Sequence, residues 1–175
     1  WSQIEFRLLV HYARGGGAAE ARRRYREDPS TDFHNMVNEW VFGGDSSMRK
    51  PAKNINFGLV YGMRTKKMAA TLGRSAEATE ALFEMYHKTM PFVKETFEAA
   101  ESIAKTRGYI TTLLGRRRRF DLWHPRQWNP DAVALPHAEA LEAYGQVKRA
   151  HTHKGLNGVM QGGAADIMKK AMVDI

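Results

Sequence analysis

The sequence predicts a mainly α-helical protein with a minor β-hairpin. Apolar residues recur at spacings of three and four through most of the chain, which is the periodicity of an amphipathic helix. Residues 109–120, YITTLLGRRRRF, instead indicate two short strands around Gly115. At 175 residues the chain is long enough for one sizeable core, and its ends, Trp1 and an apolar pattern that runs up to Ile175, favour a piece of a longer protein.

The first helix is predicted at residues 2–13, SQIEFRLLVHYA. Ser2 and Glu5 have the spacing of a capping box, in which the hydroxyl accepts from the Glu5 amide and the carboxylate reaches back. Three glycines at 15–17 are expected to end this helix. The stretch 20–31 carries RRR and an Asp-Pro turn, and we expect a solvated connector there.

The second helix is predicted at residues 33–42, between an Asp32 cap and a glycine stop. A third is predicted at 47–62, where Pro51 is tolerated only in the first turn, because its missing N–H has no partner to lose there. Further helices are expected at 65–72, at 75–90, at 91–107, from about 137 and from about 161 onwards. Residues 121–136 hold three Pro and two Trp and are expected to form an irregular loop.

Composition favours a polyanionic partner. Lys and Arg total 27 against 19 Asp and Glu, a net charge of +8, and the excess is clustered. An anionic membrane surface also attracts cations, but no uncharged run approaches the roughly 20 residues that a spanning helix needs. With no cysteine, the chain has no disulfide framework, thiol nucleophile or Cys-ligated zinc, which suits a reducing compartment.

The segment RKPAKNINFGLVYG, residues 49–62, places Arg49, Lys53, Phe57 and Tyr61 four residues apart. On a helix these side chains form one oblique row roughly 18 Å long. Cations for phosphates and rings for a base and sugar describe a nucleoside triphosphate lying along the helix. The alternative is that both rings are core residues and both cations are merely solvated.

Two features weigh against that alternative. Asn54 and Asn56 put polar groups beside the first ring. Gly58 and Gly62 each follow a ring, at positions where alanine would be the better helix former by about 1 kcal/mol. We therefore expect these glycines to give clearance to a flat ligand.

The pattern Arg, three residues, Lys, then NFGLVYG resembles motif B of the family A DNA polymerases. SQIEFRLLVHYA is similar to the part of motif A that follows its metal-binding Asp, and NGVMQGGAADIMKKAMVDI is similar to the palm segment ahead of motif C. DFHNMVNEWVF and GYITTLLGRRRRF resemble intervening segments. The resemblance covers nearly the whole chain and is weakest at 14–31 and 121–150.

The resemblance implies the fingers subdomain and adjoining parts of the palm of a right-hand polymerase. Residues 1–31 would be a palm segment with a connector, 32–136 the fingers with the nucleotide-binding helix 47–62, and 137–175 the return to the palm ahead of motif C. Both metal-binding carboxylates would lie outside these residues, so the chain alone is expected to be inactive.

The implied activity is template-directed DNA synthesis, in which a primer 3′-hydroxyl attacks the α-phosphate of a dNTP between two Mg²⁺ ions. The expected partners are primer–template DNA and dNTP substrates, with neither a membrane nor an oligomer. The expected location is the bacterial cytoplasm, or the host cytoplasm for a phage protein.

The resemblance also implies roles for individual residues. Arg49 and Lys53 would bind the β- and γ-phosphates, and Lys53 would protonate the leaving pyrophosphate, so these two are the candidate catalytic residues. The further dNTP-binding candidates are His34 at the phosphates, Phe57 at the sugar and base, Tyr61 at the template base, Glu5 at the 2′ side of the sugar, and Gln3. The primer–template candidates are Gly62, Asn157, Gln161, Arg116 and Arg117.

Other interpretations of single patterns are weaker. HTH at 151–153 suggests a metal site, but residues two apart diverge on a helix and the sequence places no third ligand. GRRRR at 115–119 is typical of a solvated basic patch as well as of a phosphate contact. Two other functions stay open: a non-catalytic nucleic-acid-binding module, and a single-subunit RNA polymerase, against which Glu5 and NFG argue.

Overall fold

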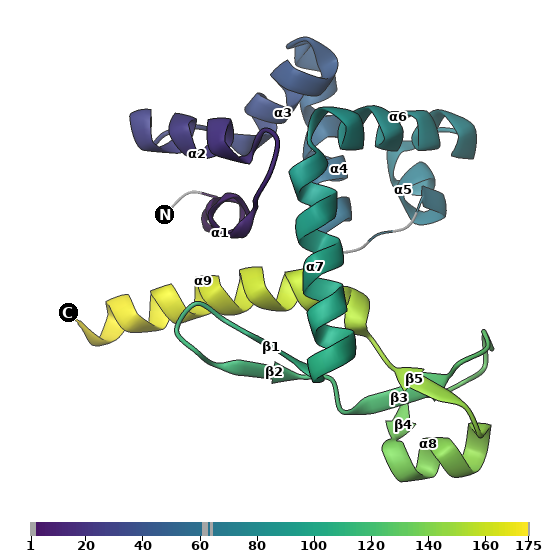
Figure 1. The fold of residues 1–175 in the computed structure, drawn as a ribbon. Coiled ribbons are helices and arrows are strands. Elements are labelled where there is room, and N and C mark those ends of the chain that lie inside the picture. Colours follow the sequence, from purple (N-terminus) through teal and green to yellow (C-terminus); the bar gives the residue numbers. More distant parts are fainter. Residues whose placement is uncertain (1–2, 61–62, 64, 175) are drawn as a thin grey trace. The chain divides into compact units, whose positions relative to one another are not determined.

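The computed structural model describes residues 3–60, 63 and 65–174, and they are mainly helical with small antiparallel sheets, as the sequence predicts (Figure 1). The chain divides into two compact units, residues 1–98 and 99–175. The boundary falls within the segment 32–136 expected to be fingers, and the assignment of fingers and palm stays a prediction.

The first unit is helical over its described residues. Its elements are α1 Ile4–Tyr12, α2 Ala18–Glu27, α3 Phe33–Phe42, the 3₁₀ turn η1 Ser46–Met48, α4 Arg49–Val60, α5 Thr65–Leu72, α6 Ala76–Thr89 and the start of α7 Pro91–Arg107. Helices α3 to α6 pack on one another and bury Phe33, Ile55, Met68 and Tyr86 completely. Pro51 lies in the first turn of α4, as predicted.

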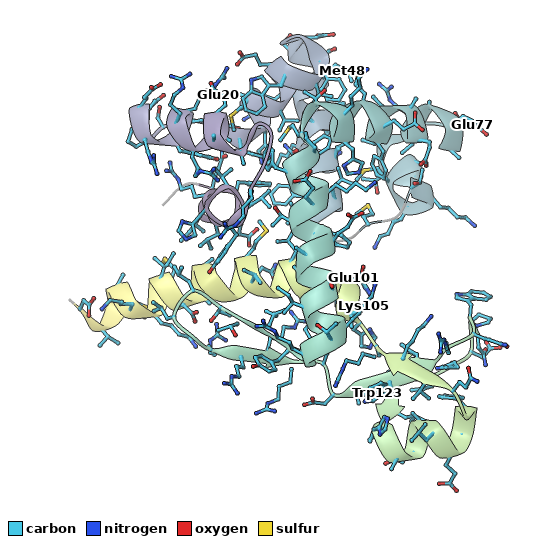
Figure 2. All side chains as sticks on the ribbon, viewed as in Figure 1. Glu20, Met48, Glu77, Glu101, Lys105 and Trp123 are labelled. Carbon is cyan, nitrogen blue, oxygen red and sulfur yellow. The ribbon has the colours of Figure 1, made fainter. Side chains whose placement is uncertain are left out.

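Helix α2 corrects the expected connector at 20–31. Its polar surface is held by ion pairs from Arg23 to Glu20 and Glu27 at helical spacing, and Figure 2 shows Glu20 on this helix. Its other face buries Ala21 and Tyr25. Arg23 therefore lies on the solvent side of an amphipathic helix, whereas Arg22 is half-buried and its Nη1 donates to the carbonyl oxygens of Val10 and Ala13. The three consecutive cations concealed the helical spacing of the buried residues in the sequence.

Two local expectations in this unit also change. Helix α1 is preceded by Gln3, which has a left-handed backbone and no side-chain cap, while Ser2 of the expected capping box lies outside the described residues. Gly58 is buried, and a Cβ built on it would lie 1.9 Å from Met68 Cε and 3.4 Å from Met63 Sδ. The space beside Gly58 is therefore filled by core side chains, above all Met68 of α5. The expectation that this glycine makes room for a flat ligand is wrong.

The second unit combines the end of α7 with two small sheets and a long helix. Its further elements are β1 Tyr109–Thr111, β2 Arg117–Arg119, β3 Leu122–Pro125, β4 Leu135–Pro136, α8 His137–Tyr144, β5 Val147–Arg149, the 3₁₀ turn η2 Thr152–Lys154 and α9 Gly155–Val173. Strands β1 and β2 form the predicted antiparallel hairpin, with Ile110 opposite Arg118. Ala104, Ile110 and Phe120 form a buried cluster against which Val159 packs.

A three-stranded antiparallel sheet in the order β4-β3-β5 replaces part of the loop expected at 121–136. Trp123, labelled in Figure 2, lies on its central strand, with the Arg149 guanidinium 4.6 Å from its ring and the His137 ring 4.4 Å away. The strands have only two to four residues each. These short strands are stabilised by pairing between segments that are distant in sequence. Local residue propensities therefore could not predict them.

Helix α9 starts at Gly155, six residues before the expected position. A Cβ on Gly155 would lie 2.8 Å from the Ala100 carbonyl oxygen, so this glycine permits close backbone contact with α7. Within the described ranges, no helix is both long and apolar enough to cross a membrane.

Candidate nucleotide site and nucleic-acid interface

Helix α4 carries the cation–ring row. Arg49 and Lys53 are exposed and Phe57 is half-buried, while Ile55 and Val60 are buried on the core side of the helix. The fourth member, Tyr61, lies outside the described residues, as does the adjacent Gly62. The described part of the row thus has the solvent-facing cations and partly exposed ring that a bound ligand requires.

Arg49 is oriented by the first turn of α3. Its Nε donates to Asn35 Oδ1 at 2.6 Å, and its Nη2 donates to Asp32 Oδ2 at 2.8 Å. Two of the five guanidinium N–H donors are thereby directed at protein oxygens, which fixes the plane of the group. Asp32 was predicted only as a helix cap, and its ion pair with a residue 17 positions away has no local sequence signature.

Asp32 uses its two carboxylate oxygens for different purposes. Oδ1 accepts from the amides of His34 and Asn35, which caps α3, while Oδ2 accepts from Arg49. Burial raises the pKa of the Asp32 carboxyl, but the amide hydrogen bonds and the Arg49 charge outweigh burial, so the net pKa shift is downward.

We expect Asp32→Asn and Asp32→Ala to separate these two tasks. Alanine loses the cap and should lower the free energy of unfolding by about 1 kcal/mol, whereas asparagine caps nearly as well as aspartate. Because the native pKa is depressed, the charge stabilises the fold above the ordinary value of 3.8 and this stabilisation is lost as pH falls through the lower native pKa.

The measurement is urea unfolding of both variants and the parent at pH values on either side of 3.8. Asp32→Asn should lose less stability than the parent over that interval. An identical pH dependence in the parent and the asparagine variant would show that the Asp32 charge does not stabilise the fold.

His34 lies in an aromatic cluster next to Phe57. Its ring centroid is 4.8 Å from that of Phe6 and 5.3 Å from that of Phe57, and only 6 % of the residue is exposed. Asn56 Nδ2 lies 3.0 Å from His34 Nδ1. Burial lowers the pKa of His34, and the charges of nearby Lys53 and Arg49 lower it further against the opposing effect of Asp32.

Lys53 lies one turn before Phe57 on α4. Its Nζ is 5.9 Å from the centroid of the Phe57 ring, at the outer limit of a cation–π contact. The ammonium group is exposed and can therefore reach an anionic ligand without breaking a buried ion pair.

Gln3 and Glu5 approach the same cluster from the N-terminal side. Gln3 Oε1 accepts from the Phe33 amide at 2.6 Å, so this residue joins the start of α1 to the start of α3. Glu5 is half-buried on α1, next to Phe6, whose ring is 5.3 Å from that of Phe57. The structure therefore gathers five described candidates around α3 and α4, namely Gln3, His34, Arg49, Lys53 and Phe57. Glu5 lies on α1, one residue before Phe6.

The remaining candidates lie in the second unit. Arg116 donates from Nε to Asp166 Oδ1 at 2.9 Å and from Nη2 to the Gly162 carbonyl at 3.0 Å, which ties the hairpin to α9. Burial raises the pKa of the Asp166 carboxyl, but hydrogen bonds, including those from Arg116 and the Leu114 amide, lower it more. Arg116 thus has a structural role that its position in GRRRR did not reveal.

Three further side chains complete the candidate nucleic-acid interface. Arg117 is exposed and stacks with its guanidinium carbon 4.7 Å from the Tyr109 ring centroid. Gln161 is exposed on α9, and Asn157 lies one turn earlier on the same helix. Asn157 Oδ1 is buried and finds no hydrogen-bond donor among the described residues.

No group of three or more His, Asp or Glu side chains in the described part of the chain is arranged to hold a metal ion. The His151 ring is 5.4 Å from His124 and 6.4 Å from His153, measured between centroids, but the three form no such group. A surface pocket of about 250 Å³ adjoins the partners of Arg49 and is lined by Asp28, Asp32, Asn35 and Glu39 among others. Its carboxylates would repel a triphosphate.

Comparison with known proteins supports the resemblance seen in the sequence. The profile of DNA polymerase family A matches residues 1–175. The thermostable DNA polymerase I of Thermus filiformis is 34% identical over 180 residues, covering 100% of this chain and 19% of the relative. A DNA-directed DNA polymerase of Pseudomonas phage M6 is 34% identical over 217 residues, covering 99% of this chain and 29% of the relative.

A solved structure is similar as well. The POL domain of Pol1 from M. smegmatis, in complex with DNA primer-template and dNTP, matches with a TM-score of 0.73 and 28% sequence identity, over 99% of this chain and 28% of that chain. This chain therefore spans less than a third of each of these relatives. The match over its whole length shows that the chain belongs to DNA polymerase family A.

Proposed function

We propose that this chain supplies the dNTP-binding surface and part of the primer–template interface of a DNA polymerase that performs template-directed nucleotidyl transfer. The observation that carries the proposal is the row on α4, where an oriented Arg49, an exposed Lys53 and a half-buried Phe57 follow one another at four-residue spacing beside His34. The family membership and the dNTP complex of a similar structure support it.

Each residue has a defined part in the proposal. Arg49 and Lys53 neutralise charge on the β- and γ-phosphates, and Lys53 donates a proton to the pyrophosphate as it leaves. Phe57 packs against the sugar and base, with Tyr61 next in the row, and Glu5 restricts the 2′ side of the sugar. The phosphate contacts of Arg49 and Lys53 favour the reaction because they strengthen as negative charge develops on the leaving group.

The primer–template part of the proposal rests on Asn157, Gln161 and Arg117, with Gly62 and Arg116 as further candidates. Amide side chains suit the minor groove, where acceptors occupy similar places in every base pair and permit contact without regard to sequence. Arg117 would bind backbone phosphates. The second unit would thus hold the duplex product of synthesis.

We extend the proposal to two Mg²⁺ ions in the complete enzyme, which would stabilise the attacking and leaving oxygens. The described residues form no carboxylate group that fits them, and the resemblance implies that the carboxylates that would hold them lie outside this chain.

The proposal is tested by measuring nucleotide binding to the 175-residue chain by calorimetry. We expect dATP to bind at least about tenfold more tightly than dAMP, because each charged phosphate contact contributes about 1.5–3 kcal/mol. Arg49→Ala combined with Lys53→Ala should remove the difference, and Lys88→Ala, an exposed cation on α6, should not.

Two other results would overturn the proposal. Equal affinity for dAMP and dATP, together with tight DNA binding, would indicate a non-catalytic nucleic-acid-binding module. Preference for ATP over dATP would instead favour an RNA polymerase.

A further inference from the structure

A buried hydrogen-bonded chain runs across three helices of the first unit and ends at His34. Tyr86 of α6 places its hydroxyl 2.8 Å from Asn56 Oδ1, and Asn56 of α4 places Nδ2 3.0 Å from His34 Nδ1 on α3. Tyr86 and Asn56 are both 0 % exposed. Polar groups buried to this degree are retained only when their hydrogen-bonding capacity is satisfied.

The direction of the chain follows from counting donors. Tyr86 carries one O–H, and Asn56 Oδ1 accepts it, which leaves the Asn56 amide nitrogen to donate to His34. With the Asn56 amide turned around, its nitrogen would face the phenol oxygen and the buried Tyr86 proton would lose its acceptor, at a cost of about 1–3 kcal/mol. The phenol therefore selects one orientation of the amide.

We propose that Tyr86 is a positioning residue that acts through Asn56 to hold His34 as the tautomer with its proton on Nε2. A nitrogen that accepts from Asn56 carries a lone pair, so in the neutral ring the proton lies on the other nitrogen. The order of the chain is then Tyr86 hydroxyl, Asn56 amide, His34 Nδ1, and an Nε2–H donor at its end.

The surroundings of His34 make this selection effective. The Phe6 and Phe57 rings pack against the imidazole, and desolvation lowers the pKa of His34. In a neutral imidazole, the tautomer decides which nitrogen donates a hydrogen bond and which accepts one. A protonated ring would donate from both nitrogens. Burial and the hydrogen-bonded chain thus act together.

The consequence for the nucleotide rests on the function proposed above. An Nε2–H offers a hydrogen bond to a phosphate oxygen, while the other tautomer would present a lone pair to the same anion and repel it. Preorganised donors are effective because they need no rearrangement when the anion arrives. Tyr86, which reaches His34 only through Asn56, would in this way influence triphosphate binding.

The tautomer is tested by ¹⁵N NMR of the histidine-labelled 175-residue chain at a pH where His34 is neutral. The His34 resonances, assigned by loss of signal in His34→Gln, should show a lone-pair nitrogen at Nδ1 and a protonated nitrogen at Nε2. Tyr86→Phe removes one oxygen and should shift both resonances toward the average of the two tautomers. Asn56→Asp, which can only accept, should move the proton to Nδ1.

Tyr25→Phe is the matched control, because the Tyr25 hydroxyl also donates to a side-chain amide oxygen, that of Gln3 at 3.3 Å, in the same unit. It should leave the His34 resonances unchanged. Unchanged His34 resonances in both Tyr86→Phe and Asn56→Asp would overturn the proposal, as would a parent spectrum with the proton on Nδ1.

Kinetics in the complete polymerase provide a separate readout. Tyr86→Phe should lower kcat/KM for dNTP by about tenfold in the parent, and should have almost no effect when His34 is already alanine. Equal losses in the two backgrounds would show that Tyr86 acts through general stability and would overturn its positioning role. If Tyr86→Phe shifts the His34 resonances but His34→Ala has no kinetic effect, Tyr86 still selects the tautomer of His34. That pair of results would contradict the role of His34 in the proposed function.

Discussion

Lys53→Ala should lower kcat of the complete polymerase by about 10²-fold or more. The contact of an ammonium group with the leaving pyrophosphate strengthens as that group gains charge, so its loss raises the barrier of the chemical step. Lys53 is exposed, and its Nζ lies 5.9 Å from the Phe57 ring centroid, so the substitution should leave the fold intact. Rapid-quench measurement of single-nucleotide incorporation gives kcat and KM separately.

Arg49→Ala provides a contrast to Lys53→Ala. Its guanidinium is already bound to Asp32 and Asn35, so we expect it to contribute to ground-state binding and its loss to act mainly through KM. Lys88→Ala removes an equally exposed cation and should change neither constant. A Lys53 variant with unchanged kcat would exclude this residue from the chemical step.

The second large effect concerns sugar selection. Glu5→Ala should raise the use of ribonucleotides relative to deoxyribonucleotides by about tenfold, because shortening the side chain removes the obstacle to a 2′-hydroxyl. Phe57→Tyr should raise the use of dideoxynucleotides by about tenfold, since the phenol can supply the polar contact that the missing 3′-hydroxyl no longer makes. Phe6, which follows Glu5 on α1, has its ring 5.3 Å from that of Phe57, so α1 contacts α4 at this point.

These two effects should be separable. Ratios of kcat/KM for each nucleotide pair are measured in both variants, with Glu84→Ala and Phe42→Tyr as controls on α6 and α3. If both ratios match the parent within error, Glu5 and Phe57 are structural and the α4 row does not form the sugar site.

The helices around α4 could be predicted because their signals are local. Asp32 and Gly43 border α3, Ser75 caps α6, and Pro51 lies where only a first helical turn accepts it. The hairpin around Gly115 was likewise evident from its turn and flanking strands. In each case the residue that fixes the element lies within the element or next to it.

The elements that sequence interpretation missed depend on distant partners. Strand β3 exists because it pairs with β4 and β5, and Trp123 meets Arg149 only in the folded chain. The same limit applies to the candidate site. Asn56 was noted as polar beside a ring, but its link from Tyr86 to His34 spans 30 and 22 residues and has no local signature.

The bond from Arg116 to the buried Asp166 bears on how ionic strength would act on DNA held at the hairpin. Each phosphate that a basic side chain neutralises on duplex DNA releases condensed counterions and contributes about 0.9 to the slope of log affinity against log salt. Four consecutive arginines, each neutralising one phosphate, would suggest a slope of about 3.6 from this segment. Because Asp166 already compensates the charge of Arg116, the counterion release from residues 116–119 should correspond to three phosphates at most.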